Sequence, residues 1–111
     1  MKAVILYPGY GASTELDERE ISYLVGGHPD VYRWNYIVRD RRGSILHEQE
    51  VLIYTGGKRA ESRGERPNRM IDGRVVYGKI VVVGSNSDLI KPVIDALMYN
   101  CMWTRVQWGA A

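Results

Sequence analysis

The sequence predicts an α+β fold: a single mixed or antiparallel sheet of about five strands with two helices packed on one face. Short runs of β-branched and aromatic residues recur along the chain, and turns rich in glycine and proline separate them. Only two segments place apolar residues at helical spacing. The chain has 111 residues, 45% of them hydrophobic, which is enough for one core and too few for two ordinary domains. We therefore expect residues 1–111 to form a single domain.

The chain begins with an apolar, β-branched run over residues 2–7, which predicts a buried strand that stops at the turn Pro8-Gly9-Tyr10-Gly11. Acidic residues follow Thr14, a pattern typical of a helix N-cap. We expect a helix from about Glu15 to Val25, ended by Gly26-Gly27.

The middle of the chain predicts a hairpin, a further strand and a loop. The run from Val31 to Val38 favours a strand, and the turn Asp40-Arg41-Arg42-Gly43 lets residues 44–48 pair back on it. Val51-Leu52-Ile53-Tyr54 predicts another strand. Residues 56–69 are polar and charged and contain several glycines, which predicts a basic surface loop.

The last third predicts a strand, a helix and an edge strand. Residues 74–84 have strand character, and Gly78 inside them indicates a bulge or bend. Ser85-Asn86-Ser87-Asp88 supplies capping residues for a helix from about Leu89 to Met102. Residues 104–108 alternate polar with apolar side chains and predict an edge strand.

Composition excludes several classes of protein. No apolar run approaches the roughly 20 residues of a membrane span, and the start of the chain lacks a signal-peptide core, so we expect a cytoplasmic protein without membrane contact. A single cysteine, Cys101, and two histidines, His28 and His47, give no clustered metal site, and we expect no cofactor. The net charge of +2 is too small to argue nucleic-acid binding from charge alone.

The basic loop over residues 56–69 is the strongest candidate for a ligand site. Its glycines permit close backbone approach, and its cations are expected to converge on one anion while an amide hydrogen-bonds a base or sugar edge. Eleven of the fifteen basic residues of the chain are arginine, which pairs bidentately with phosphate or carboxylate. Flexible basic loops without a ligand are also common. The candidate residues are Lys58, Arg59, Arg63, Arg66, Asn68 and Arg69.

A second candidate is the turn expected between the first strand and the first helix. A strand that runs through glycines into a helix can present backbone N–H groups and a helix dipole to a phosphate. The spacing matches neither a P-loop nor a dinucleotide fingerprint, so a tight turn that needs glycine is the alternative. The residues concerned are Gly9, Tyr10, Gly11, Ser13 and Thr14.

The aromatic residues are all Tyr or Trp, whose flat faces and polar tips suit bases and interfaces. Tyr32, Trp34 and Tyr36 alternate along one strand face, so Trp34 and Tyr36 are candidates for stacking on a base or lining an oligomer contact. Packing in the core is the alternative.

Catalysis has little support in the sequence. Cys101 falls on the apolar face of a predicted helix, and neither histidine lies in a recognisable motif. We therefore expect a protein that is not an enzyme.

Three stretches together resemble the domain-of-unknown-function family 3846, which is known mostly from phages and mobile elements. They are residues 2–9 with the helix end Leu24-Val25-Gly26-Gly27, then Arg66-Pro67-Asn68-Arg69, and then residues 73–84. The resemblance covers roughly residues 1 to 100, and the chain departs from it between Val51 and Glu65 and in its C-terminal extension. It implies a phage setting and a small α/β fold without an assigned activity, and small phage proteins of this size often neutralise a host molecule.

These observations predict a small phage-type binding protein that sequesters an anionic, nucleotide-like small molecule without turning it over. The alternatives are an inhibitor that docks on a host protein and a weak nucleic-acid-binding module. The exposed edge strands and the tail with Trp103 and Trp108 lead us to expect a homo-oligomer.

Overall fold

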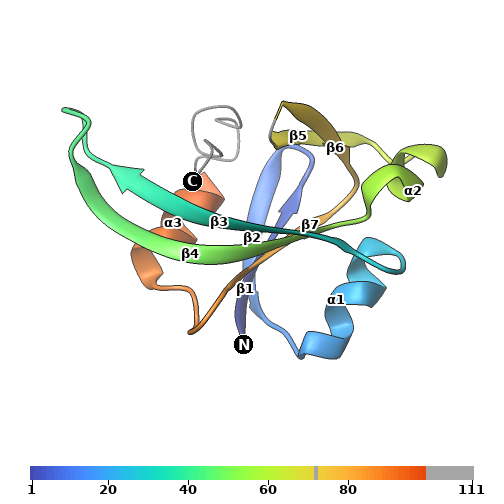
Figure 1. Ribbon diagram of the computed structural model, residues 1–111, viewed down its shortest axis with the longest axis horizontal. Helices are drawn as coiled ribbons and strands as arrows, with labels where there is room; N and C mark the ends of the chain where they lie inside the picture. The colour runs from blue at the N-terminus through green and yellow to red at the C-terminus, as the bar shows by residue number, and fades with distance from the viewer. Residues whose placement is uncertain (72, 100–111) are drawn as a thin grey trace.

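A computed structural model describes residues 1–71 and 73–99 of the chain (Figure 1). The described residues form β1 (Lys2–Tyr7), β2 (Tyr10–Glu15), α1 (Glu18–Val25), β3 (Asp30–Arg39), β4 (Ile45–Thr55), α2 (Gly57–Ser62), β5 (Pro67–Ile71), β6 (Arg74–Tyr77), β7 (Ile80–Gly84) and α3 (Lys91–Tyr99).

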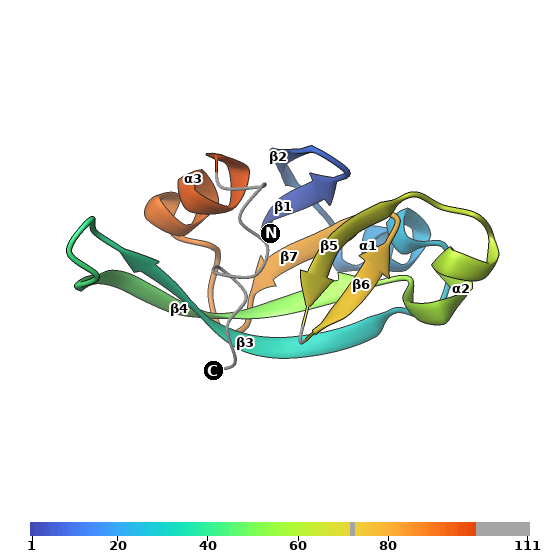
Figure 2. The same cartoon turned by 90° about the horizontal axis from the view of Figure 1, so that it is seen from above.

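The main sheet has five strands in the order β2-β1-β7-β4-β3, and every neighbouring pair is antiparallel. Strands β5 and β6 form a separate antiparallel hairpin, which crosses over the main sheet in Figure 2. The predicted α+β class with a five-stranded sheet is thereby confirmed. No helix in the described part of the chain is long and apolar enough to cross a membrane.

The helices lie on both faces of the sheet, whereas the sequence led us to expect both on one face. Val4 and Leu6 of β1 pack in the cluster that contains the buried side chains of α3, β5 and β6. Ala3 and Ile5 point the other way and pack in the cluster of α1. The physical reason is that β1 and β7 are apolar at successive positions, the pattern of a strand buried on both faces.

The segment after β1 is a second strand and not a turn that leads into a helix. The chain reverses at Pro8 and Gly9, where Gly9 adopts a φ of 94°, and residues 10–15 pair with β1 over its whole length. Helix α1 therefore begins three residues later than predicted. Its N-cap is Asp17, whose side chain accepts from the backbone of Arg19 while Glu20 closes a capping box. Hydrogen bonds from Arg19 lower the pKa of Asp17.

The predicted basic loop is largely regular structure. It contains α2 and the first residues of β5, because residues 57–62 close helical hydrogen bonds and Pro67 starts a strand that pairs with β6. The two strands expected over residues 44–54 are one continuous strand, β4. Gly78, with a φ of 79°, divides the run 74–84 into strands of two different sheets.

The last described helix, α3, starts at Lys91, so Ser85–Asp88 forms the turn that precedes it rather than its cap. Asp88 instead accepts a hydrogen bond from the backbone N–H of Lys2. Pro92 lies in the first turn of α3, where a missing N–H is tolerated. The predicted edge strand 104–108, Cys101, Trp103 and Trp108 lie outside the described residues.

Candidate functional site

The candidate site is a cleft of about 510 Å³ at one end of the molecule, where the start of β3, the start of α2 and strand β6 meet. Its cations are Lys58 and Arg59 from α2 and Arg74 from β6. Its aromatic walls are the half-buried Tyr32 of β3 and Tyr77 of β6. The cleft is large enough for a nucleotide-sized ligand.

Two carboxylates, Asp30 and Glu61, also line the cleft, so its described lining residues carry three positive and two negative charges. Asp30 lies against the α-carbon of Gly57, so close that a side chain at residue 57 would overlap its carboxylate. Gly57 also adopts a φ of 60°, which L-amino acids other than glycine rarely take. The backbone conformation therefore favours glycine where α2 begins, and a larger residue would also displace the Asp30 carboxylate.

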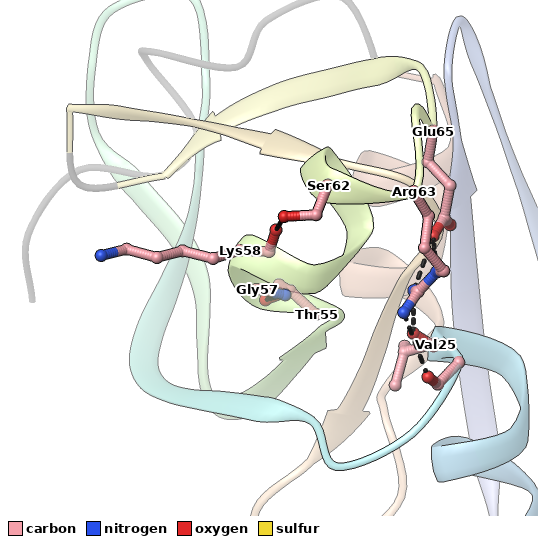
Figure 3. A network of polar contacts seen from close by, with 8 residues as sticks. Val25, Thr55, Gly57, Lys58, Ser62, Arg63 and Glu65 are labelled. Carbon is pink, nitrogen blue, oxygen red and sulfur yellow. Dashed lines mark hydrogen bonds and ion pairs between the residues drawn. The ribbon is translucent and has the colours of Figure 1, made fainter.

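The start of α2 is fixed by side chains as well as by glycine (Figure 3). The buried Thr55 accepts a hydrogen bond from the N–H of Gly57 at 3.3 Å. Ser62 donates to the carbonyl of Lys58 at 3.0 Å across one helical turn. These contacts hold the backbone of Lys58 while its side chain extends into solvent.

Arg63 points away from the cleft, so the structure contradicts its predicted place in the ligand site. Its guanidinium donates to the carbonyls of Val25 and Gly26, where α1 ends, and pairs with Glu65 at 2.6 Å. A cation at the C-terminus of a helix satisfies its free carbonyls and its dipole. Figure 3 shows Lys58 extending away from α2 on one side, while Arg63, on the other side of the helix, runs toward Val25.

Asn68 and Arg69 are also structural and do not face the cleft. The Asn68 amide donates to the carbonyls of Leu6 and Gly78, both at 2.7 Å, and its oxygen accepts from Arg69. Arg69 is only 4% exposed and donates to the carbonyl of Tyr7. The pair holds the β5–β6 hairpin against the end of β1, so neither side chain is available to a base or a phosphate.

Arg66 is exposed but lies outside the cleft. Of the predicted basic loop, the structure therefore brings only Lys58 and Arg59 together at one site. The idea that all five cations converge on one anion is wrong, because a helix and a strand distribute them over different sides of the segment.

The second predicted anion site loses its structural basis. Gly9, Tyr10, Gly11, Ser13 and Thr14 belong to the β1–β2 hairpin and precede no helix N-terminus. Residues 10–14 pair with β1 as a strand, and Tyr10 stacks on Tyr7 with ring centroids 4.8 Å apart. The alternative of a tight turn that needs glycine is the correct interpretation at Gly9.

Trp34 and Tyr36 are core residues, which excludes them as a base-stacking surface. They are 9% and 2% exposed and pack with the side chains of α3, β5 and β6. Burial raises the pKa of Tyr36, an effect that nearby Arg69 opposes. Tyr32, at the other end of the same strand face, is the residue of this series that reaches the cleft.

Sequence reasoning missed Arg74, Tyr77 and Asp30 as site residues. Arg74 is the last residue of a stretch rich in basic residues that begins at Lys58, and this charge pattern was the signal that could have indicated it as a site residue. Its placement depends on the β5–β6 hairpin folding back onto α2, a contact between segments that no local pattern encodes.

A separate polar cluster lies on the α1 side of the sheet, outside the cleft. Glu50 accepts from Ser85 and from Arg33, both at 2.7 Å, and these bonds lower its pKa. The cluster ties β3, β4 and the end of β7 together.

Comparisons with known proteins find no matching family model, curated protein or solved structure. The resemblance to the domain-of-unknown-function family 3846 stays a prediction.

Proposed function

We propose that the cleft binds an anionic small molecule with a flat ring, such as a nucleotide, and sequesters it without turning it over. The observation that carries the proposal is the meeting of Lys58, Arg59 and Arg74 with Tyr32 and Tyr77 around one volume of about 510 Å³. The cations suit phosphate oxygens, and a tyrosine ring offers a face on which a base can stack.

The charge balance of the cleft favours a small ligand over a nucleic acid. A polyanion gains affinity from many cations along its backbone, whereas here Asp30 and Glu61 offset two of the three positive charges. The same carboxylates can accept hydrogen bonds from the amino groups of a base or the hydroxyls of a sugar. Arginines and carboxylates in one cleft thus match the mixed polarity of a nucleoside phosphate.

Calorimetry with a panel of linear and cyclic nucleotides tests the proposal directly. The variant Arg59→Glu with Arg74→Glu should weaken binding by roughly tenfold or more, because it removes two phosphate-pairing groups and adds two repulsive ones. The matched control is Arg66→Glu with Lys79→Glu, which makes the same change of charge at two exposed residues outside the cleft. Equal affinities of the two variants would refute the assignment of the cleft. Recovery of the bound nucleotide unchanged tests the absence of turnover.

Docking on a host protein is the second candidate, and the tip of the β3–β4 hairpin favours it. Ile45 and Leu46 are 50% and 56% exposed there, next to Arg41 and Arg42. Apolar side chains rimmed by cations are typical of a protein interface. The absence of binding to every nucleotide, together with loss of host-protein inhibition in Leu46→Glu, would favour this function over sequestration.

A further inference from the structure

Strand β3 is an edge strand of the main sheet, and its outer edge has no strand partner among the described residues. Strand β3 is ten residues long, and among the described residues it pairs with β4 alone. Its sequence contains no proline, lysine or glycine, and its register shift lies at its last two residues, Val38 and Arg39. Natural proteins often use prolines, lysines or mid-strand bulges to block an edge strand, because its free N–H and C=O groups can recruit another strand.

We propose that a second copy of this chain pairs with this edge, antiparallel, strand β3 against strand β3. A two-fold axis then makes the contact self-complementary. The proposal does not depend on ligand binding.

The charges of β3 select the register. Directly opposed residues of an antiparallel pair point to the same face of the sheet. Because side chains alternate between the faces, the register can shift only by two residues at a time. With Trp34 at the two-fold axis, Val31 opposes the partner's Ile37 and Arg33 opposes the partner's Asn35. Val31 is 52% exposed, and this pairing covers it with an apolar side chain.

The neighbouring registers place like charges opposite each other. A shift one way brings Arg33 against the partner's Arg33, and a shift the other way brings Asp30 against the partner's Asp40. Opposed like charges destabilise a strand pair. The register centred on Trp34 avoids both and still spans residues 30–38.

The same register has a consequence for the cleft, and this part rests on the proposed function. Pro29, which lines the cleft, stands opposite the partner's Arg39. The basic turn of one copy, with Arg41 and Arg42, would then lie beside the cleft of the other and add positive charge at its entrance. Ligand affinity should therefore rise with dimer formation.

Sedimentation equilibrium without ligand tests the pairing with two double variants, which introduce like or opposite charges at residues 31 and 37. Val31→Lys with Ile37→Lys opposes two lysine pairs per dimer and should weaken association by roughly tenfold or more. Val31→Lys with Ile37→Glu opposes each lysine to a glutamate and should restore association. Leu46→Lys, at the exposed hairpin tip, is the control that should leave association unchanged.

A wild-type protein that stays monomeric at the highest soluble concentration would overturn the proposal. So would a dimer that both double variants leave intact, or one that the variant with lysine at residue 31 and glutamate at residue 37 fails to restore. Should the Ile37 variants fail to fold, Asn35→Lys opposes the partner's Arg33 and is expected to weaken association instead. Failure of nucleotide binding in a protein that dimerises as described would refute the proposed function alone.

Discussion

Replacing Asn68 by alanine should destabilise the protein, because its amide is a structural bridge and not a ligand contact. The amide donates to the carbonyls of Leu6 and Gly78, both at 2.7 Å, and its oxygen accepts from Arg69, which is 4% exposed. A buried polar group that loses its partner costs about 1–3 kcal/mol. Asn68 is half-buried, so water can replace part of the loss, and we expect a total of about 2–4 kcal/mol.

Urea denaturation followed by tryptophan fluorescence measures this free energy of unfolding. The expected loss corresponds to a midpoint lower by about 1–2 M urea with an unchanged slope. Asn35→Ala is the matched control, since that amide makes one exposed hydrogen bond to Glu48, and it should cost only about 0.5 kcal/mol. A stable Asn68→Ala protein that no longer binds nucleotide would refute the structural role and support the ligand role that the sequence alone suggested.

Three further predictions concern the end of α1, the start of α2 and two carboxylates outside the cleft. Arg63→Met should lower stability by about 1 kcal/mol through loss of the α1 carbonyl contacts, with nucleotide affinity unchanged in calorimetry; a loss of affinity would place Arg63 in the site. Gly57→Ala should reduce stability and ligand affinity together, because its φ of 60° is strained for alanine and the added methyl group overlaps Asp30, and a thermal unfolding midpoint equal to wild type would contradict this. Acid should destabilise the protein, because hydrogen bonds lower the folded-state pKa of Asp17 and Glu50. The stability that these carboxylates contribute is present above their unfolded pKa values of 3.8 and 4.5 and is lost as the pH falls through their folded-state pKa values. Asp17→Asn with Glu50→Gln should therefore flatten the dependence of the unfolding free energy on pH in this range.

The sequence predicted the strands well because β-branched runs and glycine turns are local signals. The hairpin of β3 and β4 and the break at Gly78 are examples. It misjudged residues 10–15, whose small and polar side chains lack the usual strand pattern and become a strand through pairing with β1. Both faces of β1 are apolar, and this signal for helices on two sides was present in residues 3–6.

The site was predicted only in part, because charge along the chain does not say where side chains point. Lys58 and Arg59 share a cleft with Arg74, which lies fifteen residues further along, whereas the nearer Arg63 and Arg69 stabilise carbonyls elsewhere. Tertiary contacts decide which arginine remains free to bind, and no local pattern carries that information.

The most direct test of the account is a titration of the ¹⁵N-labelled protein with a nucleoside monophosphate, followed by NMR. We expect progressive, saturable shifts at the amides of Lys58, Arg59, Arg74 and Tyr77, with little change at the β1–β2 turn around Gly9. Shifts confined to that turn, or no shifts at millimolar nucleotide, would contradict the claim that the cleft binds such an anion.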